Sequence, residues 1–506
     1  MRTTIVAMGA AALVAGAAAR ADAFCGFYVG GAGADMFNNA TEVVLMRHGT
    51  TTVLSMENNY QGPPDRFALV VPVPEVVKEA QVKTLPRDVF KKVDVLGAPR
   101  LVEYWEQDPC YVEPPDEAGE EIEVNGATVA REVDDDDAAD RKDYHVKVEA
   151  RFSVGEYDIE VLSAEQSTGL ERWLVDHHYS IPPKAEPLLR PYVEQGTKWF
   201  VAKVDPKKVT FDHGMATLSP LRFYYDSPEF TLPIRLGLAN SSGTQDLIVN
   251  VLAPNDTRYE VANYGNVTIP TNLPVTDDVR THFGEFYAAL FDHTLAQVPN
   301  AVVTEYAWSA GSCDPCPGPT LDPDDLATLG ADVITARYKG LDAYSYTLTR
   351  LHARYGKDIS NDLVFRAVEP IEGGRGIPGA SGELSMDVAR GGTNNFQGRY
   401  VILHPWTGVV TCASPARGRW GGPPAGQSIA SGPQIATNTA FAPRGKVQLA
   451  AMLTKDMPKI GAMSSAATSL PDPVRKPQGC GCQAQGGGAA VLGLGVLALI
   501  VRRRRR

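Results

Sequence analysis

The sequence predicts an α+β domain rich in antiparallel strands, with several short helices, an acidic loop insertion, a C-terminal flexible stalk and a short membrane helix. Two patterns predict this fold class. β-rich runs return directly through turns at Gly49 and Gly155, which is typical of antiparallel pairing. Short runs with helical spacing stand between groups of strands instead of alternating with single strands. The 506 residues, 44% of them hydrophobic, can bury a large core.

The strands are predicted from runs of β-branched and aromatic residues that end at turn residues. They cover residues 43–46, 51–56, 66–71, 144–154, 158–162, 199–204, 221–225, 232–238 and 247–252. The first two form a hairpin around Gly49, and the third is expected to end at Pro72 and Pro74. Further elements, of type left open, are expected at residues 347–355, 362–367 and 400–403.

The helices are predicted from apolar residues at helical spacing and from their end signals. They cover residues 86–96, 163–176, 185–195, 282–295 and 322–330. The last of these has Asp322 as its N-cap, Pro323 in its first turn and Gly330 at its end. Residues 113–143 are strongly acidic and poor in large apolar side chains, so they are predicted to form a solvated loop.

The N-terminal residues 1–23 are predicted to be a secretory signal peptide. Arg2 precedes an apolar stretch, and Ala21-Asp22-Ala23 fits the small-x-small rule, so cleavage is expected between Ala23 and Phe24. Because Phe24 and not a small residue precedes Cys25, lipidation at Cys25 is not expected. The ectodomain then covers residues 24–455, and residues 456–482 form a stalk that contains Cys480 and Cys482.

The tail, residues 483–506, has an apolar run at 489–501 followed by five arginines. The arginines stay on the cytoplasmic side of a membrane, so the rest of the chain is exported. The apolar run is shorter than the roughly 20 residues of a stable span, which leaves a transient sorting segment and a permanent anchor both open. With Cys480 and Cys482 before it, the tail resembles the myxobacterial C-terminal sorting signal. That resemblance implies processing near one of the two cysteines and delivery to the cell surface.

The net charge limits the kinds of partner that the protein can bind, and the export that is predicted bears on the state of its cysteines. The formal net charge is −12, and the predicted ectodomain is more acidic still because both ends carry net positive charge. Such a surface repels nucleic acids, so nucleic-acid binding is excluded. An exported protein meets an oxidising compartment, so disulfides are expected among five cysteines, whose pairing stays open because their number is odd. They are Cys25, Cys110, Cys313, Cys316 and Cys412.

Several short motifs, spread over residues 25 to roughly 415, resemble a secreted bacterial family known as DUF2330. They include Cys25-Gly-Phe-Tyr28, residues 58–64 and 67–74, Leu170-x-x-Trp-Leu174, residues 219–223, Cys313-Asp-Pro-Cys316, residues 348–352 and His404-Pro-Trp406. The resemblance implies no activity, cofactor or catalytic residue.

Two motifs suggest enzymes. Arg47-His48-Gly49 after a strand resembles the histidine-phosphatase signature, in which the histidine is phosphorylated and the arginine binds the phosphoryl group. That chemistry requires a second histidine, for which His213 and His404 are the candidates. The other interpretation is a hairpin turn that uses Gly49.

Cys313 and Cys316 have redox spacing, but they precede a proline-rich loop and not a helix, which favours a structural disulfide over a thiol oxidoreductase or a zinc site. Asp176-His177-His178 is interpreted as a helix end and Asp134–Asp137 as a solvated run, so neither is predicted to bind metal.

No complete catalytic set, cofactor site or metal site is predicted. The leading hypothesis is an exported cell-surface or envelope protein with a structural or binding role. Its expected partners are the export and sorting machinery and the membrane, reached through the tail; its ligand is not identified. The alternatives are an exported phosphatase using His48 and a thiol oxidoreductase using Cys313 and Cys316.

Overall fold

The computed structural model describes residues 27–30, 40–57, 59–61, 67–111, 145–177, 179, 185–212, 215–240, 243–342, 344–357, 359, 361–379, 382–424, 433–437 and 444–457. The predictions for the signal peptide, Cys25, the acidic insertion 113–143, the stalk, Cys480, Cys482 and the tail lie outside these residues.

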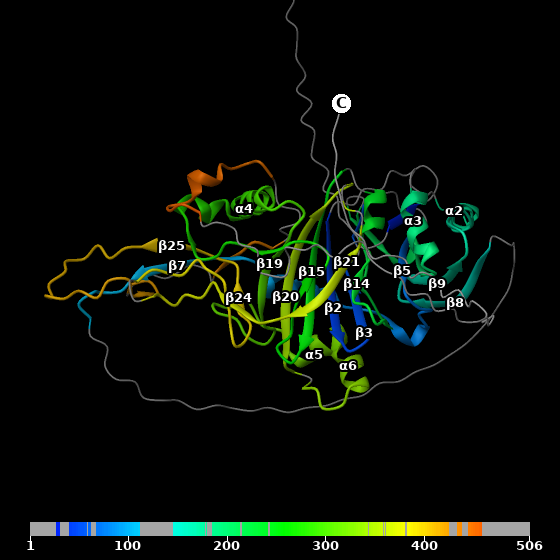
Figure 1. Cartoon of the computed structure of the whole chain (residues 1–506), viewed down its shortest axis with the longest axis horizontal. Helices are drawn as coiled ribbons and strands as arrows, with labels where there is room; N and C mark the ends of the chain where they lie inside the picture. Colours follow the sequence, from blue (N-terminus) through cyan, green and yellow to red (C-terminus); the bar gives the residue numbers. More distant parts are fainter. Residues whose placement is uncertain are drawn as a thin grey trace, which may run out of the picture. The chain divides into compact units, whose positions relative to one another are not determined.

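Two large sheets form the centre of the fold (Figure 1). One has five strands in the order β1 (Phe27–Gly30), β5 (Phe67–Val73), β10 (Lys198–Val204), β9 (Tyr157–Ala164) and β8 (Val146–Val154). The other has eleven, in the order β23 (Ala389–Arg390), β22 (Ile371–Gly373), β24 (Asn395–Gln397), β19 (Val302–Ser309), β20 (Tyr346–Tyr355), β15 (Gln245–Pro254), β2 (Ala40–His48), β3 (Thr51–Met56), β13 (Leu221–Asp226) and β6 (Val82–Thr84), with β17 (Asn266–Thr268) paired to β19. Most neighbours are antiparallel, as predicted, but β2 and β15 are parallel.

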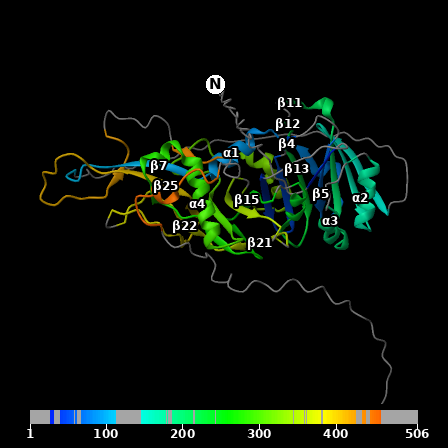
Figure 2. The same ribbon diagram turned by 90° about the horizontal axis from the view of Figure 1, so that it is seen from above.

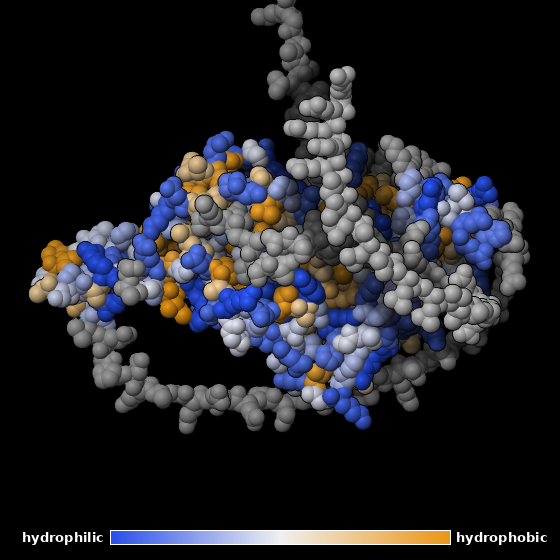
Figure 3. All heavy atoms as spheres, viewed as in Figure 1, coloured by the Kyte–Doolittle hydropathy of each residue, from blue (hydrophilic) through white to orange (hydrophobic). Residues whose placement is uncertain are grey.

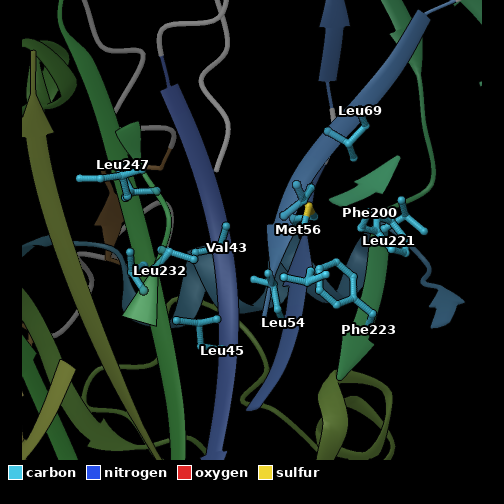
Figure 4. Packing of buried hydrophobic residues seen from close by; sticks show 14 of the residues in the cluster. Val43, Leu45, Leu54, Met56, Leu69, Phe200, Leu221, Phe223, Leu232 and Leu247 are labelled. Carbon is cyan, nitrogen blue, oxygen red and sulfur yellow. The ribbon is translucent and has the colours of Figure 1, made fainter. Parts of the chain in front are cut away.

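The main core fills the space between these sheets. Alternate side chains of β5 and β10 point inward and meet alternate side chains of β2, β3, β13 and β15 (Figure 4). Leu45 and Leu54 on one sheet, and Leu69 and Phe200 on the other, are all fully or almost fully buried. The alternation in these strands is therefore what holds the two sheets face to face.

Short helices cover the outer faces of both sheets. α2 (Ser167–Asp176) and α3 (Ala185–Glu194) pack on the five-stranded sheet, where they cover Ala68 and Val70 of β5 (Figure 2). β5 is therefore buried on both faces, which explains its unbroken run of apolar residues. On the eleven-stranded sheet, α1 (Asp88–Gly97), α5 (Pro323–Leu326) and α6 (Asp332–Arg337) cover one region and α4 (Phe283–Gln297) covers another.

Smaller sheets complete the described fold. They are β11 (Thr210–Asp212), β12 (Met215–Thr217) and β4 (Asn59–Gln61); β14 (Thr231–Leu232), β21 (Leu363–Val368) and β16 (Arg258–Val261); and β18 (Leu273–Pro274), β25 (Arg399–His404), β7 (Arg100–Glu106) and β26 (Trp420–Gly421), with β27 (Gln434–Ile435) also paired to β7. Single 3-10 turns cover Glu79–Gln81, Pro206–Lys208, Arg235–Asn240, Asp277–Thr281 and Leu449–Met452.

Two predicted strand boundaries are wrong for identifiable reasons. The strand at residues 66–71 continues through Pro72, because Pro72 lies beyond the stretch paired with β1 and needs no hydrogen-bond donor on that side. The strand predicted at 232–238 stops at Leu232, where Pro233 follows, and becomes a 3-10 turn.

The helix with Asp322 as its N-cap ends at Gly330, as predicted. Gly330 has a non-helical φ of +134°, and the kink there separates α5 and the turn that follows it (Ala327–Ala331) from α6. A Cβ at Gly330 would lie 2.8 Å from the side chain of Val53, so glycine here also permits close helix–sheet packing.

Candidate functional site

A cluster of charged residues with a fully buried centre lies on the α4 side of the eleven-stranded sheet. Arg350, His352 and Arg354 are alternate residues of β20, so their side chains share one face. A bulge in β19 between Thr304 and Tyr306 adds Glu305, which points toward the same face. Arg350 and His352 together therefore meet one carboxylate in the interior.

Glu305 accepts three hydrogen bonds at the centre of this cluster. Arg350 Nε donates to Oε2 at 2.8 Å, His352 Nδ1 bonds Oε1 at 2.7 Å, and the hydroxyl of Tyr287 from α4 donates to Oε1. Burial alone would raise the pKa of Glu305, but the charge and hydrogen bond of His352, together with Arg350, lower it to about 2. Glu305 is thus a buried carboxylate that stays ionised.

His352 lies between two carboxylates. Its Nε2 is 3.3 Å from Asp246 Oδ1 on β15, and its ring stacks on Phe291 with a centroid distance of 3.8 Å. Burial tends to lower the pKa of His352, but Glu305 and Asp246 raise it above its ordinary value. The cluster extends from Asp246 to Arg354, at 2.9 Å, and to Arg444 near the C-terminal end of the described chain, at 3.1 Å.

The opposite end of Arg350 meets α1 and β2. Its NH1 atom is 2.8 Å from Asp94 Oδ1 and 4.0 Å from Glu42 Oε1. Burial and then the charge of Asp94 raise the pKa of Glu42 well above its ordinary value. Asn250 donates to Glu42 at 2.7 Å.

The cluster pairs groups of opposite charge throughout. The cations are Arg350, His352, Arg354 and Arg444, and the anions are Glu305, Asp246, Asp94 and Asp292, which binds Arg354 and Arg444. Every charge has an opposite partner inside the cluster, which is what a structural network requires. This cluster was not predicted from the sequence, although charged residues at alternate positions of a hydrophobic strand are a signal for it.

The Arg47-His48-Gly49 motif forms a hairpin turn, as one of its two interpretations predicted. His48 pairs directly with Thr51, and Gly49 has φ +55°. The guanidinium of Arg47 donates to the carbonyl oxygens of Thr50 and Ser227 at 2.8 and 2.9 Å, and the edge of the His48 ring meets Tyr338.

The structure does not bring His48 and His404 together. His404 lies on β25 of a different sheet and bonds Glu103 at 2.9 Å, and His213 lies outside the described residues. The phosphatase interpretation therefore gains no partner for His48 within the part of the chain that is described.

His177 closes α2, as predicted for the Asp176-His177-His178 segment. Its backbone N–H and its ring both bond the carbonyl oxygen of Trp173, and the ring stacks on Trp173 at 3.9 Å. Among the described residues, no group of three or more His, Cys, Asp or Glu side chains could hold a metal ion. His178 lies outside them.

Two disulfides pair four of the five predicted cysteines. Cys110, after β7, bonds Cys412, which is 302 residues further along the chain. Cys313 bonds Cys316 within a loop that follows β19, so the disulfide expected from their spacing is present. Both elements that meet near the second disulfide, β7 and β25, begin with an arginine.

These two arginines, Arg100 and Arg399, lie opposite each other in the parallel pairing of β7 and β25, and both are fully buried. Arg100 donates to the carbonyl oxygen of Pro315 at 2.8 Å, and Arg399 donates to that of Asp314. Burial lowers the pKa of Arg100 to about 10, and it also lowers the pKa of Arg399. The Cys313–Cys316 loop therefore rests on two buried positive charges.

The bacterial family described as "Uncharacterized protein conserved in bacteria (DUF2330)" matches residues 19–366. The chain belongs to this family. The matched part contains β2, β15, β19, β20 and the Cys313–Cys316 loop, but it ends before His404-Pro-Trp406, so the resemblance extends less far than that motif suggested. No curated protein and no solved structure matches the chain.

Proposed function

We propose that this protein is exported and acts at the bacterial cell surface or outer envelope in a structural or binding role. The observation that carries the proposal is the Cys110–Cys412 disulfide. Such bonds persist in oxidising compartments and are rare in the reducing cytosol. A bond between residues so far apart in sequence also requires that the fold first bring β7 and the segment after β25 together.

The two ends of the sequence support the same location. Residues 1–23 have the pattern of a signal peptide, with cleavage between Ala23 and Phe24. The tail resembles a sorting signal in which Cys480 or Cys482 is the processing and attachment point. Among the described residues, no helix is long and apolar enough to cross a membrane, and the tail lies outside them.

A non-catalytic role agrees with how the charged groups are used. The buried acids and bases of the Glu305 cluster bind one another, and Arg47 of the hairpin binds backbone carbonyls. On the face shown in Figure 3, hydrophilic side chains predominate and hydrophobic ones form small groups, as suits a domain that projects into water.

Location and processing can be tested together in a bacterium that carries the matching sorting machinery. Intact cells are treated with a protease that cannot cross the envelope, and the termini of the protein are determined by mass spectrometry. We expect a surface-exposed form that begins at Phe24 and lacks residues 491–506. A variant with Cys480→Ala and Cys482→Ala should accumulate as a longer, inner-membrane form.

The single replacements serve as matched controls, because they show which cysteine is the attachment point. An intact Arg506 end on surface-exposed protein would contradict processing and leave a permanent anchor as the better account. Protein that stays in the cytosol with its first 23 residues would contradict export itself.

A further inference from the structure

We propose that Cys313 and Cys316 form a redox-active pair that exchanges disulfides with cysteine thiols of other exported proteins. This goes beyond the surface role proposed above. The inference rests on the surroundings of the pair: the loop is held by side chains that do not depend on the disulfide, and two buried guanidinium groups donate to the backbone carbonyls of Asp314 and Pro315 between the two cysteines.

The loop is anchored by hydrogen bonds that do not involve either sulfur. Gln397 and Arg399 both donate to the carbonyl oxygen of Asp314, and Arg100 donates to that of Pro315. Arg100 is itself fixed by a hydrogen bond to the carbonyl oxygen of Leu96 at 2.6 Å. Both cysteines therefore remain next to each other in the reduced state, ready to form the bond again.

Among the described residues, the Asp314 carboxylate is the only one that forms an ion pair with either arginine, and the pair is long, with an exposed carboxylate. The hydrogen bonds of Arg100 go to carbonyl oxygens, and the ion pair that Arg399 forms among the described residues is with Asp314 at 3.9 Å, whose side chain is 73% exposed. A nearby positive charge favours a thiolate over a thiol. Stabilising the reduced, thiolate form makes the disulfide more oxidising.

The two disulfides of the described fold differ in what they contribute to stability. Stabilisation by a disulfide increases with the length of the loop that it closes. The Cys110–Cys412 bond closes a loop with a sequence separation of 302, whereas Cys313–Cys316 closes one with a separation of 3. The short bond is thus poorly explained as a structural staple.

Exposure assigns a role to each sulfur. Cys316 is exposed, whereas Cys313 is half-buried and packs against the core beneath α1 and α5. A thiolate of the partner protein attacks Cys316 Sγ, the Cys313–Cys316 bond breaks, and Cys313 leaves as a thiolate. A second thiolate of the partner then attacks the partner sulfur that is bonded to Cys316 in the mixed disulfide. Cys316 is released, two electrons pass to the pair, and the partner gains a disulfide.

The first test compares both disulfides within one molecule. The full-length protein is equilibrated in glutathione buffers of increasing reduced-to-oxidised ratio, alkylated, and read by peptide mass spectrometry. Cys313–Cys316 should be half-reduced at a ratio at least 100-fold lower than Cys110–Cys412 requires. Equal resistance of the two bonds, or greater resistance of Cys313–Cys316, would overturn the proposal.

The second test measures the charge effect. The alkylation rate of the reduced pair should have a pH midpoint about one unit below the ~8.5 of a free cysteine. Asp314→Asn, which removes an exposed negative charge, should lower this midpoint further, whereas Asp324→Asn in α5 should leave it unchanged. Arg399→Gln should raise it and Arg399→Lys should restore it. A pH midpoint at or above ~8.5, or one that is unchanged in Asp314→Asn, would refute the proposal that a thiolate is stabilised.

The third test traps the exchange itself. In Cys313→Ser, with Cys316 first converted to its mixed disulfide with glutathione, a reduced one-cysteine peptide should displace glutathione and remain bound to Cys316 as a stable mixed disulfide, whereas Cys316→Ser treated in the same way should form far less. The reverse preference would overturn the assignment of Cys316 as the attacked sulfur. Absence of mixed disulfide in both variants would overturn the activity.

Discussion

Glu305 and His352 share a hydrogen bond of 2.7 Å because the bulge in β19 turns an extra residue toward β20. Without the bulge, Glu305 would continue the alternation of β19 and would not be aimed between Arg350 and His352. The pair is fully buried, so its stability depends on a geometry that the backbone supplies.

Replacing the Glu305 carboxylate with a neutral group should destabilise the folded protein. Glu305→Gln leaves Arg350 and His352 without their shared counter-charge, and we expect the free energy of unfolding to fall by about 3–5 kcal/mol. Glu194→Gln, at an exposed position of α3, is the control and should change stability little. Guanidinium titrations measure both, and matching midpoints would show that the network does not stabilise the fold.

The raised pKa of His352 predicts a decline of stability toward alkaline pH. The folded protein binds this proton more tightly than the unfolded chain, so the contribution is complete below about pH 6.5 and is lost as pH rises through the folded pKa. His352→Gln should be less stable at every pH but should lose most of this slope. A parallel pH profile for the two proteins would assign the slope to other groups.

Toward acid pH, Glu305 acts in the opposite direction. Its pKa of about 2 lies below that of an unfolded glutamate, so its contribution is present above about pH 4.3 and is lost as pH falls toward 2. The Glu305→Gln variant should therefore show a weaker decline of unfolding free energy between pH 4.3 and 2 than the wild type. Measuring unfolding at several pH values in this range checks the difference.

Gly330 should tolerate alanine poorly. Alanine there combines a positive φ with a contact of 2.8 Å to Val53, and we expect a loss of about 3 kcal/mol. Gly340→Ala is the matched control, because Gly340 also has a positive φ but no heavy atom lies within 4 Å of its added Cβ, so about 1 kcal/mol is expected. Equal losses would mean that packing against β3 is not the constraint.

A phosphatase assay separates the leading function from one alternative. With Arg47 bound to backbone carbonyls, we expect the protein and its His48→Ala variant to hydrolyse p-nitrophenyl phosphate equally slowly. Hydrolysis that is fast in the wild type and lost in His48→Ala would favour the exported phosphatase instead. Circular dichroism of both proteins provides the folding control.

Local features of this fold could be predicted from sequence, because their causes are local. The hairpin at Gly49, the strands on either side of Gly155 and the start of the helix at Asp322 each depend on a few neighbouring residues. The Cys313–Cys316 bond belongs to the same class, since three residues of spacing bring the sulfurs together.

Features that depend on distant partners could not be predicted. The parallel pairing of β2 with β15, the bulge at Glu305 and the position of Arg100 beside Arg399 are set by register between strands far apart in sequence. Pro72 shows the same limit. It can lie within β5 only because the pairing with β1 stops before it, so that no backbone N–H is needed on that side.

The Cys110–Cys412 bond makes the chain a closed covalent ring over most of its length. A protease that cuts once between these residues would open the ring without releasing a fragment. Cys110 lies within the family match and Cys412 beyond it, so the two parts of the sequence stay joined after such a cut. A chain cut once in this way would run as two fragments only after the disulfide is reduced.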